Sequence, residues 1–78
     1  MSEPTMRTYT IFDRPLDYLG GFVVREFLVY GGGTEPVAGR VMGTALNLTE
    51  ARKLVPWEAD ACIPRADTDD RSVVETWL

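Results

Sequence analysis

Histidine is absent from this 78-residue chain, and Cys62 is its single cysteine. Without histidine, the chain lacks the usual general base near neutral pH, the commonest metal ligand and the partner of every Ser–His or Cys–His nucleophile. A lone cysteine excludes an internal disulfide. We therefore expect a protein that is not an enzyme and that uses no metal and no cofactor.

Long apolar runs are also missing. None approaches the ~20 residues that a membrane-spanning helix needs, and no basic amphipathic helix that could lie on a membrane is evident. The first ten residues, MSEPTMRTYT, lack both the charged start and the apolar centre of a secretory signal. These absences predict a cytoplasmic protein with no membrane partner.

The apolar residues that are present suffice for a packed core. They make up 45% of the chain and include two Trp, three Tyr and three Phe, which exceeds what a disordered chain carries. A chain of this length has room for one hydrophobic core. We expect a single domain over residues 1–78, with residues 1–6 frayed.

The net charge of −4 is unevenly placed along the chain. Residues 1–55 hold six acids and six bases, whereas residues 56–78 hold six acids and two arginines, so the whole excess lies in the last third. Such a segment repels phosphate backbones and attracts basic surfaces. We therefore expect a protein partner with a basic surface and no direct contact with nucleic acid.

The pattern of apolar residues predicts an α+β fold. In chain order we expect strands at 7–12, 22–30 and 37–46, a helix at 47–55, and strands at 58–65 and 72–78. The stretch FVVREFLVY at 22–30 is apolar on both faces, which is typical of a central strand. The order β-β-β-α-β-β favours a small antiparallel sheet of about five strands with one short helix packed on one face.

Local signals support the helix and the strand before it. Asn47 and Glu50 fit a capping box, Thr49 is an alternative cap, and Pro56 ends the helix. Gly39 and Gly43 dilute the strand at 37–46 and indicate a bulge or a close neighbour. The buried side of the helix is predicted to hold Leu48, Ala51, Leu54 and Val55.

The stretch PRADTDDRS at 64–72 gathers Asp67, Asp69 and Asp70 between two arginines. A calcium loop counted from Asp67 needs Gly at the sixth position and Glu at the twelfth, where this chain has Ser72 and Leu78. Aspartates also initiate turns by accepting bonds from nearby backbone N–H groups. We favour a turn, with an acidic patch facing a partner as the alternative and a metal site as the weakest interpretation.

Other single residues have two interpretations each. Arg25 and Glu26 lie among large apolar residues, where pairing with a neighbouring strand is favoured over a binding role. Cys62 is expected to be a small buried hydrophobe rather than a nucleophile. We favour a core position for Trp77, whereas Trp57 fits the core and a partner anchor equally well.

Several stretches together resemble a set of small phage and prophage proteins of GC-rich proteobacteria. They are YTIFDRPLDYLGGFVVREFLV, a TEAR helix that reaches Val-Pro, and the closing IPRADTDDRSVVETWL. The resemblance covers nearly all of residues 8–78 and carries no catalytic motif. Small accessory proteins of this kind often disarm a host defence, and the acidic ones are similar in size and charge to anti-CRISPR proteins. The resemblance implies a type I anti-CRISPR protein that acts in the host cytoplasm.

Together with the acidic last third, this resemblance implies a non-enzymatic inhibitor that binds a Cascade effector complex, imitates DNA with an acidic surface and blocks target DNA binding. An alternative is a generic protein–protein interaction module that forms a homodimer through the exposed edge of the last strand or of VAGRVMG at 37–43. An enzyme or metal protein ranks last. The predicted partner-binding residues are Trp57, Glu58, Asp60, Asp67, Asp69, Asp70 and Glu75.

Overall fold

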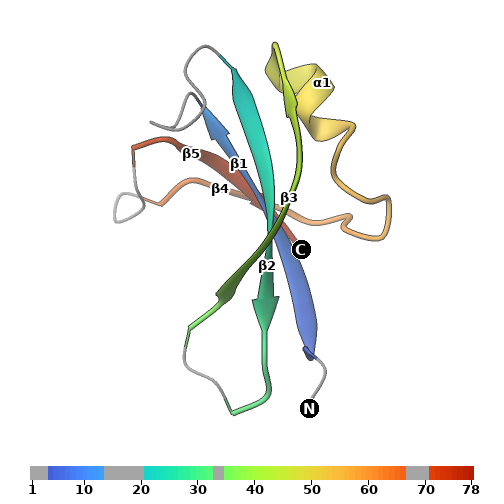
Figure 1. The fold of residues 1–78 in the computed structure, drawn as a ribbon, viewed down its shortest axis with the longest axis vertical. Helices are drawn as coiled ribbons and strands as arrows, with labels where there is room; N and C mark the ends of the chain where they lie inside the picture. The colour runs from blue at the N-terminus through green and yellow to red at the C-terminus, as the bar shows by residue number, and fades with distance from the viewer. Residues whose placement is uncertain (1–3, 14–20, 33–34, 67–70) are drawn as a thin grey trace.

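The computed structural model describes residues 4–13, 21–32, 35–66 and 71–78. They form a five-stranded antiparallel sheet and one helix (Figure 1). This confirms the predicted α+β class and the chain order. The elements are β1 (Met6–Asp13), β2 (Phe22–Val29), β3 (Val37–Ala45), α1 (Leu48–Arg52), β4 (Cys62–Pro64) and β5 (Val73–Trp77).

The strands are arranged in the order β3-β2-β1-β5-β4, so β1 lies at the centre and β2 beside it is interior, as its two apolar faces predict. Tyr9 of β1 illustrates this position, because it lies opposite Glu26 of β2 on one side and Trp77 of β5 on the other. The prediction that the last strand has an exposed edge is wrong, since β4 returns beside β5 and pairs with it. The edges of this sheet are β3 and β4.

The helix is shorter than predicted but begins as expected. The Asn47 side chain accepts a hydrogen bond from the Glu50 backbone N–H at 2.8 Å. In a full capping box the Glu50 carboxylate would also accept from the Asn47 backbone N–H. Here this carboxylate instead accepts from the Lys53 ammonium at 3.1 Å. After Arg52 the backbone bonds tighten to an i to i−3 pattern that runs to Val55, just before Pro56.

The main core lies between α1 and one face of the sheet, here called the helix face. Its buried members are Tyr9, Ile11, Val24, Ala51 and Ala59. The predicted buried side of the helix is confirmed in outline, because Ala51 is fully buried and Leu48, Leu54 and Val55 pack partly buried against the core. Figure 1 shows α1 beside the C-terminal end of β3 on a strongly twisted sheet.

Two glycines of β3 lie at close approaches, as the sequence indicates. A Cβ atom at Gly43 would be 3.1 Å and 3.2 Å from the two terminal methyl carbons of Leu54, so its absence lets the chain after α1 pack against β3. A Cβ at Gly39 would meet the backbone oxygen and the carboxylate of Glu26, each at 3.0 Å. The register between β2 and β3 also shifts between Val24 and Phe27, which confirms the expected irregularity.

The opposite face of the sheet carries its own contacts. The rings of Phe12 and Phe27 lie with centroids 6.4 Å apart, and the hydroxyls of Thr10 and Thr76 are 3.3 Å apart. Within the described ranges, α1 is the only helix, and it is too short to cross a membrane.

Candidate functional site

The predicted partner-binding residues separate into three groups. Asp67, Asp69 and Asp70 lie outside the described residues. Glu75 is buried in the sheet. Trp57, Glu58 and Asp60 are exposed on the segment that follows α1.

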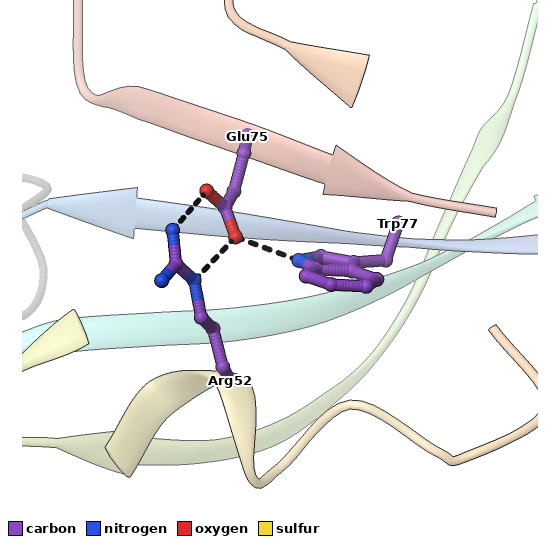
Figure 2. Close-up of polar contacts among 3 residues, drawn as sticks. All are labelled: Arg52, Glu75 and Trp77. Atoms are coloured by element: carbon purple, nitrogen blue, oxygen red, sulfur yellow. Dashed lines mark hydrogen bonds and ion pairs between the residues drawn. The ribbon is translucent and has the colours of Figure 1, made fainter. Parts of the chain in front are cut away.

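Glu75 does not contribute to an acidic exterior, because its side chain is only 8% exposed. It lies opposite Ile11 on the helix face, where Arg52 of α1 reaches it. The Arg52 Nε donates to one carboxylate oxygen at 3.0 Å and Nη2 donates to the other at 2.9 Å. The Trp77 Nε1 donates to the first oxygen at 2.7 Å (Figure 2). This corrects the prediction that Glu75 faces a partner.

The electrostatics of this contact match its geometry. Hydrogen bonding from Arg52 is the main cause that holds the pKa of Glu75 below its ordinary value, and it outweighs burial, which acts in the opposite direction. The bond from Trp77 lowers that pKa further. Trp77 packs partly buried against the core, in agreement with its prediction. The three residues therefore tie α1 to β5.

The interpretation of Cys62 as a buried hydrophobe is wrong. The residue is exposed, because β4 is a three-residue strand at the edge of the sheet. Partial burial of the thiol and, second, the nearby Glu75 carboxylate raise the pKa of Cys62 above its ordinary value. A thiol of raised pKa stays protonated at neutral pH and is a poor nucleophile.

The segment after Pro56 forms a turn rather than the start of the strand predicted at 58–65. The Ala59 N–H donates to the Pro56 carbonyl at 3.0 Å, and Ala59 is buried in the core. On either side of this anchor the side chains point outward: Trp57 is 87% exposed, and Glu58 and Asp60 are exposed. We call residues 57–60 the Trp57–Asp60 turn.

A wide groove runs between this turn and the part of the helix face that α1 does not cover. The groove is open to solvent and has a volume of about 870 Å³. Tyr9 and Glu26 contribute to it from the central strands, and Glu58 contributes from the turn. Its lining residues are Pro4, Thr5, Met6, Arg7, Tyr9, Glu26, Arg40, Pro56, Glu58, Ala59 and Leu78.

Charged groups of both signs surround Tyr9 in this groove. Burial raises the pKa of Tyr9 above its ordinary value, and Glu26 raises it further. Glu58 acts in the same direction, whereas Arg7 and Arg40 oppose it. The phenol therefore stays neutral at physiological pH.

Glu26 has the cross-strand partner that the sequence predicts. Its carboxylate lies 3.7 Å from the Arg7 Nε on β1, and Arg7 is exposed. Arg25 is half-buried and lies opposite Thr10 on one side and Val41 on the other. The groove was not predicted from the sequence. The signal that could have indicated it is Glu26, an acid on an apolar strand face, together with a neighbouring strand that contains Gly39.

Within the described ranges, no group of three or more Cys, Asp or Glu side chains is arranged to hold a metal ion. The chain matches no family model, no curated protein and no solved structure. The resemblance to phage accessory proteins therefore stays a prediction. Function has to follow from the chemistry of the described surface.

Proposed function

We propose that the protein is a non-enzymatic inhibitor that binds a basic surface of a protein partner, with the Trp57–Asp60 turn at the centre of the contact. The observation that carries this proposal is the position of Trp57, whose side chain is 87% exposed between Pro56 and Glu58. Exposed carboxylates of Glu58 and Asp60 flank it. An aromatic anchor beside acidic groups suits a partner surface rich in Lys and Arg.

The energetic case for Trp57 rests on its size. A tryptophan buries about 150–250 Å² when a partner covers it, and its two rotatable bonds limit the entropy lost. Residues of this type at interface centres commonly contribute about 2 kcal/mol or more when truncated to alanine. Inside this chain, by contrast, Trp57 has little contact to lose. Its removal is therefore expected to affect binding and to leave folding intact.

The more specific proposal is a type I CRISPR effector complex as partner. Such a complex has to bind DNA, and DNA-binding channels are lined by Lys and Arg. The acid-rich last third of the chain supports this choice, because it supplies negative charge that competes with a DNA backbone for the same surface. The resemblance of the sequence to phage accessory proteins is the second support.

Surface plasmon resonance with an immobilised type I effector complex tests the proposal. We expect W57A to speed dissociation at least tenfold, and we expect E58K/D60K to slow association and to weaken its salt dependence. E35K/E50K is the matched control, because it changes the net charge by the same amount at two exposed acids outside the turn. Circular dichroism establishes that each variant is folded.

Two outcomes contradict the proposal. Unchanged kinetics for both W57A and E58K/D60K remove the turn as the contact surface. No binding of the wild-type chain to the effector complex removes this choice of partner. A separate D67K/D69K/D70K variant tests the predicted role of the aspartate cluster.

A second candidate function is homodimerisation through β3. This strand is an edge of the sheet, with β2 as its ladder partner, and Val37 on it is 52% exposed. An exposed edge offers backbone N–H and C=O groups to a second strand. The molar mass in solution decides, because a monomer at micromolar concentration argues against edge pairing.

A further inference from the structure

The groove lies on a part of the helix face that α1 does not line. The helix ends at Arg52, and the chain that follows covers the helix face through Leu54, Val55 and the buried Ala59 of the Trp57–Asp60 turn. Tyr9 and Glu26, both nearly buried, line the groove from the sheet. The groove is wide enough to admit a side chain from another molecule.

Glu26 is an unusual residue to find on the floor of this groove. Its carboxylate side chain is only 12% exposed, and the ion pair that it forms with the Arg7 Nε is long, at 3.7 Å. The Arg7 side chain is itself 57% exposed. An ion pair to an exposed arginine at this distance contributes little, whereas a nearly buried carboxylate gains most from short, charge-assisted hydrogen bonds.

Gly39 leaves room for the Glu26 side chain because it has no Cβ. A Cβ at position 39 would lie 3.0 Å from the Glu26 carboxylate oxygen and 3.0 Å from its backbone oxygen. The Glu26 carboxylate thus lies against Gly39 of β3, and the neighbouring Arg40 also lines the groove. Any larger residue at position 39 would displace the carboxylate.

We propose that this groove receives one basic side chain, Arg or Lys, from the protein partner, and that the Glu26 carboxylate binds its charged end. This proposal deepens the proposed function and rests on it, because the ligand is taken to be a side chain of the protein partner proposed there. Glu58 on the opposite wall supplies a second carboxylate. Arg7 can swing into solvent as the ligand enters, and Arg40 disfavours a second cation, so the site takes a single basic side chain rather than a cluster.

The test uses the purified chain and a capped peptide, acetyl-Gly-Arg-Gly-amide, titrated while ¹⁵N–¹H spectra are recorded. We expect saturable shifts of the amide signals of Tyr9, Glu26, Arg40 and Glu58, with a Kd on the order of 1 mM. The same peptide with norleucine in place of arginine is expected to cause no saturable shift. Equal shifts from both peptides overturn the proposal.

Three variants sharpen the test. E26Q is expected to lower the affinity for the arginine peptide at least tenfold, because it removes the carboxylate that binds the guanidinium. It is expected not to lower the urea midpoint of unfolding, because the nearly buried charge that it removes is compensated only weakly by the long ion pair with Arg7. E50Q, an exposed acid on α1, is expected to bind as the wild type does. R7Q removes the competing guanidinium and is expected to strengthen binding several-fold, which keeps the proposal testable if E26Q does not fold. Unchanged binding in E26Q, or weaker binding in R7Q, overturns it.

This titration separates the two proposals. If the peptide binds but W57A and E58K/D60K leave effector binding unchanged, the groove stands and the proposed function fails. If those variants disrupt effector binding while the peptide causes no saturable shift, the Trp57–Asp60 turn stands and the groove is not a receptor for a basic side chain.

Discussion

Replacing Glu75 by glutamine keeps the shape of the side chain while removing the charge that ties α1 to β5. In the wild type, two N–H groups of Arg52 and one of Trp77 donate to this carboxylate at 2.7–3.0 Å. Hydrogen bonds to a charged group contribute about 1.5–3 kcal/mol each, and neutral ones about 0.5–1.5 kcal/mol. Glutamine keeps one acceptor oxygen and turns an NH₂ group towards a second donor.

At least one bond is therefore lost in E75Q and the others weaken, and we expect the free energy of unfolding at pH 7 to fall by about 2 kcal/mol. A domain of this size has only about 3–5 kcal/mol in total. The same change corresponds to a fall of about 8–16 °C in Tm. The effect is large because Glu75 is buried, and a buried polar group left without its partner is costly.

The pH dependence of stability gives a second, independent readout. The folded-state pKa of Glu75 is lowered, chiefly by hydrogen bonding from Arg52, whereas the unfolded value is about 4.3. The unfolded chain therefore binds the proton more readily. The contribution of Glu75 to stability is fully present above pH 4.3 and is lost as the pH falls through the folded value. E75Q is expected to show a flatter acid limb than the wild type.

Urea unfolding followed by tryptophan fluorescence at pH 7, 5, 4 and 3 measures both quantities. E50Q is the control, because Glu50 pairs with Lys53 on the exposed side of α1 and its loss is expected to cost less than about 0.5 kcal/mol. An E75Q variant as stable as the wild type at pH 7, with the same acid limb, would refute the assignment of Glu75 as the tie between helix and sheet.

Three further predictions concern single contacts. N47A removes the side chain that accepts from the Glu50 N–H, and is expected to cost about 1 kcal/mol in urea unfolding, whereas N47D is expected to cost much less. G43A places a Cβ about 3.1 Å from Leu54, at a backbone φ of +157° that L side chains rarely adopt, and is expected to cost about 1–3 kcal/mol; if G43A costs as much in an L54A background as in the wild type, the contact with Leu54 is not part of the cause. Cys62 is an exposed residue, but partial burial of its thiol and, second, the Glu75 carboxylate raise its pKa. It is therefore expected to react slowly with iodoacetamide at pH 7, and faster in E75Q. Rapid labelling of the wild type at pH 7 would contradict this.

The sequence predicts the order of elements because each element carries a local signal. Alternation of apolar residues marks β1 and β2, and Asn47 with Glu50 marks the start of α1. Boundaries are less well predicted after the helix. The hydrogen bond from the Ala59 N–H to the Pro56 carbonyl closes a turn where the sequence predicts the start of a strand at 58–65. The prediction failed there because a four-residue turn and a short strand space their apolar residues alike.

Sheet topology is the part that local signals do not contain. The last strand of a chain need not lie at the edge of its sheet. Here β5 comes last, but β4 pairs with it and forms the edge instead. The same pairing decides which side chains are inside. Glu75 lies opposite Ile11 and is therefore buried, although by composition it counts as one more surface acid. The groove is lined by residues from separate segments of the chain, among them Arg7, Glu26 and Glu58, which no local motif brings together.

The inward position of Glu75 and the outward position of Trp57 together determine how a contact surface on this chain works. The last third carries six acids and two arginines, and pairing of Glu75 with Arg52 leaves at most three excess negative charges for its surface. Charges on a solvated rim mainly speed encounter, and salt screens them over about 8 Å at physiological ionic strength. A desolvated indole instead slows dissociation. The surface of the last third has less charge than composition suggests, and Trp57 is a large aromatic side chain exposed among the described residues. Rising salt should therefore lower the association rate of a complex, while its lifetime stays set by Trp57.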